Sequence, residues 1–184
     1  MITELSKMLK QTIEVKDAQA AVVVLLKKVD QKIFVLFVKR AEKTTDPWSG
    51  QTALPGGKRD PKDQDMKATV ARETFEETGL NLLEGYRFLG VIDPVNSIQK
   101  PDMKILPFVV LQEKEEKLKL NEELSEYFWT PLKELVKHKG IIKNSFGEYP
   151  AYIIENCIIW GLTYRIMEKL LFLLEVLEPQ NHKK

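Results

Sequence analysis

The sequence predicts an α/β fold in which a mixed β-sheet lies between helices. Three observations lead to this prediction: apolar, β-branched runs early in the chain, a helical segment after a double glycine, and further strand-like runs that end in a long amphipathic segment. The chain has 184 residues, of which 43% are hydrophobic. That is enough for one domain with its own core, so we expect a single domain over residues 1–184 with N-terminal and C-terminal helices.

The expected strands are short segments rich in apolar and β-branched residues and bounded by turn residues. Residues 18–27 and 32–40 are expected to form a first hairpin. The other expected strands are 52–54, 86–93, 105–112, 127–130, 141–143 and 151–154. The charged segment 113–123 is expected to be a loop.

Four segments are expected to be helical: 2–13, 65–78, 131–137 and 157–177. The last one contains the longest apolar run, which is interrupted by Arg165, Glu168, Lys169 and Glu175. These charges argue against a membrane span and for an amphipathic, mostly buried helix. Its apolar side chains could pack inside the domain or across the boundary of a homodimer.

Composition excludes several classes of protein. A net charge of +1 leaves no basic footprint for nucleic acid. Cys157 is the single cysteine, so there is no internal disulfide framework, and its apolar surroundings favour a small core residue over a nucleophile. The first 17 residues mix charges with apolar residues and do not form a signal peptide. We therefore expect a cytoplasmic protein without nucleic-acid or membrane partners.

The helix expected at 65–78 carries three carboxylates, Glu73, Glu76 and Glu77. At about 100° per residue they fall within an arc of about 100° on one face. Three anions so close raise each other's pKa unless a cation lies among them, and carboxylate oxygens suit Mg²⁺ or Mn²⁺. A pair of glutamates on a helix is more often a solvated face. The opposite face is expected to be the core side of the helix and carries Ala68, Ala71, Phe75 and Thr78.

The residues around this helix favour a functional site over a solvated face. Gly56-Gly57 precedes the helix and lets the backbone turn tightly and expose a carbonyl. Arg72 lies four residues before Glu76, at pairing distance on the same flank. Gly79 provides a helix stop.

The segment from Arg72 to Leu80, Arg-Glu-Thr-Phe-Glu-Glu-Thr-Gly-Leu, resembles the end of the box that defines the Nudix family. The chain departs from the family's box in two respects, and neither concerns the three glutamates. Between Gly57 and Arg72 the loop is one residue longer than the usual box, and its early acid is Asp63 instead of Glu. Thr74 occupies a position at which the family prefers an aliphatic residue.

The resemblance implies a Nudix-type α/β/α sandwich and a metal-dependent hydrolase that cleaves a diphosphate joined to another moiety. It also implies that Mg²⁺ or Mn²⁺ is held by Glu73 and Glu77, with Glu76 close behind and the Gly56 carbonyl as a further ligand. Arg72 would hold the carboxylates in place by pairing. Members of the family often take another acid from a later loop, and Glu123 is the first choice among Glu122, Glu123 and Glu126, each of which could equally be a solvated acid.

The segment before the box resembles that of coenzyme A pyrophosphatases at Arg40-Ala41 and at Gly50, while Leu54 replaces a phenylalanine. Coenzyme A or a related nucleotide conjugate is therefore the leading substrate. ADP-ribose, dinucleotide polyphosphates and damaged nucleoside triphosphates are the alternatives, and so is a non-catalytic module that binds nucleotides. The residues expected to meet the substrate are Arg40, Lys58 and Arg59, through phosphates, and Trp48, by stacking on a base.

Overall fold

The computed structural model describes residues 1–12, 15–44, 49–98, 100–144, 147–155 and 157–177. The strands of the larger sheet are β1 (Ala18–Val29), β2 (Lys32–Arg40), β3 (Thr52–Ala53), β4 (Gly56–Lys58), β5 (Tyr86–Val91), β6 (Val95–Asn96), β7 (Lys104–Gln112) and β8 (Leu124–Pro131). The smaller sheet consists of β9 (Lys139–Asn144), β10 (Gly147–Ile154) and β11 (Cys157–Trp160). The helices are α1 (Ile2–Met8), α2 (Met66–Thr78), α3 (Leu132–Lys137) and α4 (Gly161–Leu177).

The larger sheet is mixed, as predicted. Its main order is β3-β2-β1-β7-β5, and β1 pairs with β7 in parallel while the other pairs are antiparallel. The long strand β1 has two partners on its other edge. Its C-terminal half pairs with β2, and Ala20 to Val22 in its N-terminal half pair with β4. The glycine-containing strand β4 is thereby fixed to the middle of the sheet.

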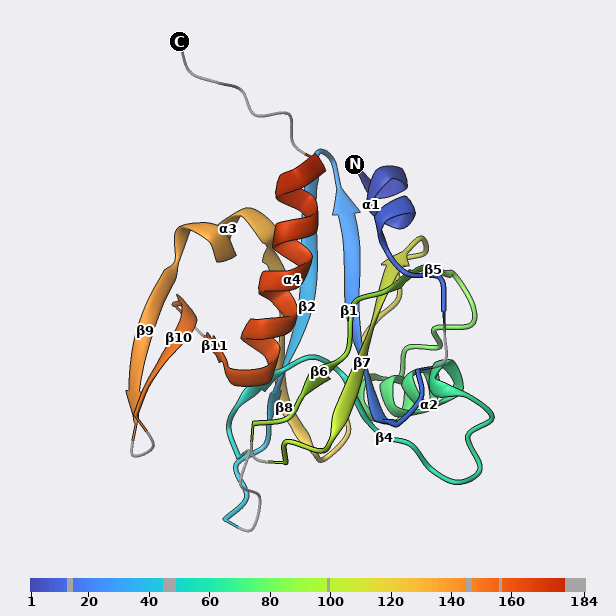
Figure 1. Ribbon diagram of the computed structural model, residues 1–184, viewed down its shortest axis with the longest axis horizontal. Coiled ribbons are helices and arrows are strands. Elements are labelled where there is room, and N and C mark those ends of the chain that lie inside the picture. Colours follow the sequence, from blue (N-terminus) through green and yellow to red (C-terminus); the bar gives the residue numbers. More distant parts are fainter. Residues whose placement is uncertain (13–14, 45–48, 99, 145–146, 156, 178–184) are drawn as a thin grey trace.

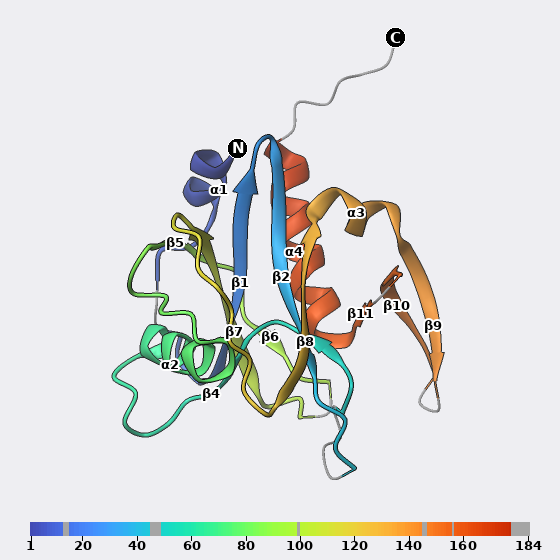
Figure 2. The same ribbon diagram turned by 180° about the vertical axis from the view of Figure 1, so that it is seen from behind.

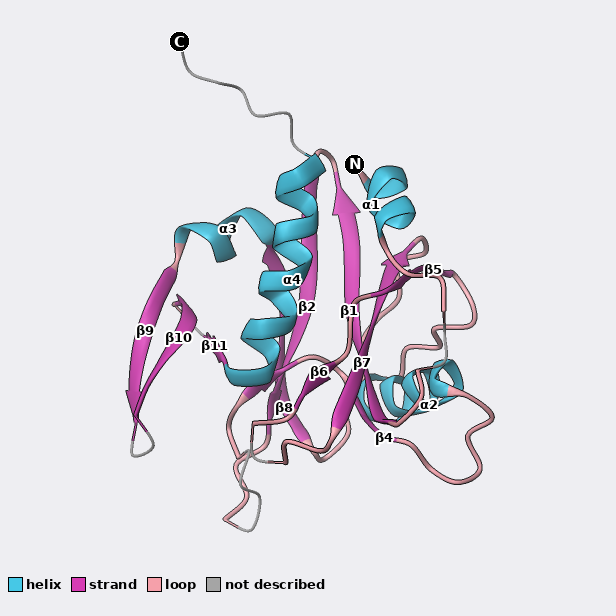
Figure 3. Cartoon of the chain, in the orientation of Figure 1, coloured by secondary structure: helices cyan, strands magenta, loops and turns pink. Residues whose placement is uncertain are grey.

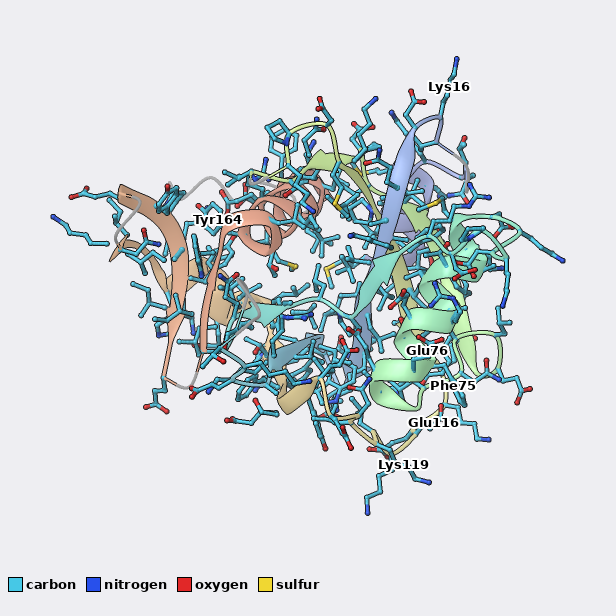
Figure 4. All side chains as sticks on the ribbon, turned by 90° about the horizontal axis from the view of Figure 1, so that it is seen from below. Lys16, Phe75, Glu76, Glu116, Lys119 and Tyr164 are labelled. Carbon is cyan, nitrogen blue, oxygen red and sulfur yellow. The ribbon has the colours of Figure 1, made fainter. Side chains whose placement is uncertain are left out.

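Helices cover both faces of this sheet, which confirms the α/β/α arrangement. Figure 1 shows α4 in front of the sheet, and the view from behind in Figure 2 brings α2 to the front. One apolar cluster joins α1 and α4 to the sheet through residues such as Leu5, Leu170 and Phe37. A second cluster packs Met66 and Val70 of α2 against the opposite face. In Figure 4, Phe75 and Glu76 on α2 lie on the other side of the molecule from Tyr164 on α4.

The prediction of a helix from residue 157 was wrong at its start. Residues Cys157–Trp160 form β11, and the helix begins at Gly161, whose φ is +62°. The strand alternates between buried and exposed side chains, since Cys157 and Ile159 are buried while Ile158 is 46% exposed. Successive side chains of a strand point to opposite faces, so this alternation is typical of a strand. Figure 3 shows the small sheet β9–β11 beside α4.

The other element predictions differ from the structure mainly at their ends. The first helix ends at Met8, and β8 begins three residues earlier than predicted. The short strands β4 and β6 were not predicted. Cys157 is a buried free thiol, as expected. No helix in the described part of the chain combines the length and the apolarity needed to cross a bilayer.

The prediction for the core face of α2 was right for Ala71 and Thr78, which are buried, and wrong for Phe75. Phe75 is 56% exposed, whereas Glu77 is only 6% exposed. The buried side chains of α2 are Met66, Thr69, Val70, Ala71, Thr74, Glu77 and Thr78. The helix therefore turns one of its carboxylates toward the sheet, because the face that packs on β1 and β4 includes the position of Glu77. Asp65 caps the helix by accepting from the Ala68 N–H at 2.7 Å, and Gly79 ends it in the left-handed region.

Two fully buried threonines on α2 provide a matched test of this packing. The Thr74 hydroxyl has no hydrogen-bond partner among the described residues, whereas the Thr78 hydroxyl donates to the Thr74 carbonyl at 2.6 Å. Thr74→Val removes an unsatisfied polar group, so we expect it to raise the free energy of unfolding by about 1 kcal/mol. Thr78→Val should lower it by about the same amount. Urea unfolding at pH 7 measures both, and a loss of stability in Thr74→Val would contradict the prediction.

Candidate active site

The candidate site forms where α2 faces β4. The Gly56 N–H donates to Glu77 Oε2 at 2.9 Å. A Cβ at Gly57 would lie 2.8 Å from Glu73 Oε1 and closer still to the rest of that carboxylate. The two glycines thus bring the backbone against the carboxylates of Glu73 and Glu77.

Gly56 also has a structural reason to be glycine. Its φ is +139°, which side-chain-bearing residues rarely adopt. A Cβ there would lie 2.6 Å from Val22 Cα on β1 and overlap the Ala21 carbonyl oxygen. The close pairing of β4 with β1 therefore requires glycine at this position.

Arg72 joins the loop before α2 to two of the carboxylates. Its guanidinium donates to both Asp63 oxygens at 3.0 and 2.9 Å, to Glu73 at 3.0 Å and to Glu76 at 3.2 Å. It also donates to the Lys58 carbonyl at 3.1 Å. The Asp63 side chain is 7% exposed, and the Arg72 guanidinium beside it holds the pKa of that carboxyl far below its usual range. The pairing that was predicted for Arg72 is present.

Asp63 is a residue whose part in this network the sequence did not settle. The loop of one extra residue left open which of Asp63 and Gln64 takes the place of the early acid of the box. In the structure, Asp63 accepts from Arg72, and Gln64 offers its carbonyl to Arg59 at 3.0 Å. The signal in the sequence was the acidic side chain itself, because only a carboxylate can accept both guanidinium bonds.

The surroundings of Glu73 and Glu77 disfavour the charged forms of both carboxylates, which is an electrostatic strain. Burial raises the pKa of Glu77 to about 7, the Gly56 N–H lowers it, and the charge of Glu73 raises it. Burial also raises the pKa of Glu73, against the opposing effect of Arg72. Arg40 acts on Glu77 as a favourable charge, which places this residue near the acidic group. Such strain is typical of a site that accepts a cation.

Glu123 is the member of its loop whose charge acts on this site. Its charge raises the pKa of both Glu73 and Glu77. The chain is held there by backbone hydrogen bonds, from Asn121 N–H to the Glu77 carbonyl at 3.0 Å and from Ala41 N–H to the Glu123 carbonyl at 2.8 Å. Glu126 instead lies 3.4 Å from the Lys39 ammonium. The backbone of this loop is thus held beside α2 and β2.

The predicted substrate-binding residues take different places. Lys58 follows the glycine pair on β4. The Arg59 guanidinium donates to the carbonyls of Asp63 and Gln64 at 3.3 and 3.0 Å and so supports the loop before α2. Trp48 lies outside the described residues.

The donor set is suited to a hard divalent cation. Glu73, Glu77 and Glu123 are oxygen donors that repel one another, and a cation among them would remove that repulsion. Within the described ranges, no three Asp, Glu, His or Cys side chains already converge as a formed metal site. The Glu76 side chain is 53% exposed, and its carboxylate forms an ion pair with Arg72. The chemistry of the donors therefore fits Mg²⁺ or Mn²⁺.

Comparison with known proteins agrees with this geometry. The family model described as NUDIX domain matches residues 17–149. Human mitochondrial coenzyme A diphosphatase NUDT8 is 32% identical over 176 residues, which cover 91% of this chain and 73% of that protein. The mouse protein of the same name is 32% identical over 167 residues and covers 86% of this chain and 79% of its own. The predicted resemblance to the coenzyme A pyrophosphatase subgroup is confirmed by these two relatives.

Two solved structures support the fold. The crystal structure of a Nudix hydrolase from M. smegmatis, RenU, superposes with a TM-score of 0.60 at 16% identity and covers 90% of this chain and 91% of its own. The crystal structure of a C. elegans Ap4A hydrolase binary complex gives a TM-score of 0.52 at 20% identity, with 65% of this chain and 84% of its own covered. Both likenesses concern the fold alone.

Substitutions of the two glycines should have different effects. In Gly56→Ala the new methyl group overlaps β1, so we expect a large fall in melting temperature or no folded protein. In Gly57→Ala it meets the end of the Glu73 side chain, which can move, so the melting temperature should change by no more than about 5 °C. Gly161→Ala is the control for backbone strain alone, because its φ is +62° and no atom lies within 4 Å of the added Cβ. Circular dichroism on heating measures all three, and equal losses in Gly56→Ala and Gly161→Ala would contradict the overlap.

The ion pair of Asp63 with Arg72 predicts a dependence of stability on pH. The pKa of Asp63 is lowered from its ordinary 3.8, so its stabilisation is fully present above about pH 4 and is lost as the pH falls further. Asp63→Asn should therefore lower the free energy of unfolding at pH 7 by about 1.5–3 kcal/mol, the range for hydrogen bonds to charged groups. The difference from wild type should shrink at pH 3. Urea unfolding at both pH values tests this, with exposed Asp102→Asn as the control, and a difference that does not depend on pH would refute the assignment.

Proposed function

The chain belongs to the NUDIX family and is a Nudix pyrophosphatase, and we propose that it cleaves the diphosphate of coenzyme A or a related nucleotide conjugate with Mg²⁺ or Mn²⁺. The observation that carries this proposal is the placement of Glu73 and Glu77 against the glycine pair, where the charge of Glu123 also acts on both. The names of the human and mouse relatives support coenzyme A as the substrate.

In this proposal Glu73, Glu77, Glu76 and the Gly56 carbonyl hold the metal. A divalent ion supplies charge neutralisation at the phosphates and lowers the pKa of a bound water. The protein orients these ligands. The Gly56 N–H fixes one oxygen of Glu77, and Arg72 fixes one oxygen of Glu73.

The remaining residues of the site would act on the water and on the phosphates. We assign Glu123 as the general base that takes the proton of the attacking water, because its charge acts on the carboxylates of α2 although it does not belong to their helix. Arg40 and Lys58 would pair with phosphate oxygens. Arg59 acts indirectly in this proposal, through the loop that holds Asp63 against Arg72.

Location and assembly stay predictions. We expect a cytoplasmic protein, although the human and mouse relatives are named as mitochondrial proteins. The apolar side chains of α4 that were candidates for a homodimer boundary, Leu170, Leu171 and Leu174, are buried inside the domain. Ile158 on β11, in the segment that was predicted to begin this helix, is 46% exposed. Light scattering would determine whether the chain forms a homodimer.

Replacement of one ligand tests the function. Glu77→Gln keeps the shape of the side chain and removes its charge, so hydrolysis should fall by at least about a hundredfold while the fold is retained. The assay incubates the protein with Mg²⁺ and coenzyme A, ADP-ribose, a dinucleotide polyphosphate and an oxidised nucleoside triphosphate, and identifies the products. The control is Glu84→Gln on an exposed turn, which should leave the rate unchanged.

The outcomes of this assay are distinct. Cleavage of coenzyme A ahead of the other compounds supports the proposed substrate, and preference for another compound would replace it. Failure of wild type to cleave any of the four, despite nucleotide binding, would indicate a non-catalytic module. Reaction in ¹⁸O-labelled water then identifies the phosphorus that is attacked.

A further inference from the structure

The last carbonyl groups of α2 are capped by a loop that is distant in the sequence. At the C-terminal end of a helix the final carbonyls have no partner within the helix. Here the Lys119 N–H donates to the Thr78 carbonyl at 2.8 Å, and the Asn121 N–H donates to the Glu77 carbonyl at 3.0 Å. The loop between β7 and β8 therefore lies against the end of the helix that carries the acidic residues.

The side chain of Asn121 shapes this loop into a turn. Its Oδ1 accepts from the Glu123 N–H at 2.9 Å, and its backbone carbonyl accepts from the Leu124 N–H at 3.3 Å. An asparagine side chain that accepts from the residue two positions on forms an Asx turn, which takes the place of a backbone turn. Asn121 is half-buried. This one residue thus makes hydrogen bonds to the backbone of both Glu77 and Glu123.

The other side of Glu123 is held by the end of β2. Its carbonyl accepts from the Ala41 N–H at 2.8 Å, directly after that strand. The register of β2 with β8 shifts between Lys39 and Arg40, so that Arg40 pairs with Leu124 beside Glu123. Bulges of this kind are common next to active sites, where they redirect side chains. The backbone of Glu123 is therefore fixed between α2 and β2.

The charge of Glu123 agrees with this placement, because it acts on both Glu73 and Glu77. Glu126 on β8 instead pairs with the Lys39 ammonium at 3.4 Å. Glu123 itself is exposed, so its own burial does not hold it near the carboxylates of α2. Its position depends on the backbone that carries it, and the Asn121 turn is the part of that backbone that a single side chain controls.

We propose that Asn121 is a positioning residue for hydrolysis, whose turn holds Glu123 at the end of α2. The proposal rests on the proposed function, in which Glu123 takes the proton of the attacking water. Asn121 touches neither the substrate nor the metal in this assignment and acts through Glu123. A general base contributes about 10²–10⁴-fold to a rate and must be aligned with the proton it takes, so a displaced turn lowers kcat.

The first test measures hydrolysis of coenzyme A by two variants in Mg²⁺. Asn121→Ala removes the side-chain acceptor and leaves the backbone bond to Glu77 possible. Its kcat should fall by about tenfold with little change in KM, since groups that bind the substrate are kept. Asn121→Asp keeps an acceptor oxygen at the same place, so its kcat should stay within about threefold of wild type.

A double-mutant cycle determines whether Asn121 acts through Glu123. Glu123→Gln should lower kcat by at least about a hundredfold, because it removes the base. In that background Asn121→Ala should have no further effect, since the group that it positions no longer takes a proton. A residue that only stabilised the fold would slow hydrolysis by the same factor in both backgrounds.

Asn81 provides a matched control. It forms the same kind of turn after α2, in which its Oδ1 accepts from the Leu83 N–H at 3.1 Å and its carbonyl accepts from the Glu84 N–H at 3.0 Å. That turn carries neither a proposed ligand nor the proposed base. Asn81→Ala should therefore lower the melting temperature about as much as Asn121→Ala does and leave kcat unchanged.

Amide hydrogen exchange gives a readout that does not need turnover. The Glu123 N–H is bonded to the Asn121 side chain, so Asn121→Ala should speed the exchange of this amide by about tenfold. Asn121→Asp should retain the slow exchange. If Asn121→Ala does not fold, Asn121→Ser takes its place in each comparison, because a serine hydroxyl forms such a turn more weakly.

The two proposals fail in different ways. Unchanged kcat in Asn121→Ala, an Asn121→Asp variant as slow as Asn121→Ala, or an equal fall of kcat with and without Glu123→Gln would overturn the role of Asn121. Unchanged exchange of the Glu123 amide in Asn121→Ala would overturn the turn itself. Faster exchange in Asn121→Ala, without turnover of any substrate by wild type, would leave the turn in place and overturn the proposed hydrolysis.

Discussion

The site depends on one close contact, the packing of the Gly56-Gly57 backbone between β1 and the carboxylates of α2. Because neither residue has a side chain, β4 can pair with β1 on one side and receive Glu73 and Glu77 on the other. The Gly56 N–H then compensates part of the cost of burying Glu77. Since β1 also pairs with β7 and β2 in the middle of the sheet, the position of the carboxylates is set by the core itself.

Charge is distributed unevenly around this contact. Burial and mutual repulsion raise the pKa of Glu73 and Glu77, and Arg72 offsets part of this by spanning Asp63, Glu73 and Glu76. A cavity of about 340 Å³ beside β4 has Lys58 and Lys100 among its mostly uncharged lining residues.

Sequence patterns were reliable where a local rule determines the structure. The hairpin of β1 and β2, the span of α2 and its end at Gly79 follow from β-branched runs and from a left-handed glycine. Sequence patterns failed where packing against distant residues decides which side chains are buried. The face opposite the glutamates was predicted to be the core face, but α2 buries Glu77 and exposes Phe75, because the glycine strand offers Glu77 a hydrogen bond that periodicity does not reveal.

The sequence by itself determined the family, the mixed sheet between helices and the identity of the acidic residues, since these depend on residue types at fixed short spacings. Only the tertiary structure decided that the charge of Glu123 acts on Glu73 and Glu77 while Glu126 lies at Lys39. It also decided that residues 157–160 form a strand whose Trp160 meets Tyr149 beside β4. Such long-range juxtapositions arise from the pairing of distant strands and from the burial of their faces, which short segments of sequence do not encode on their own.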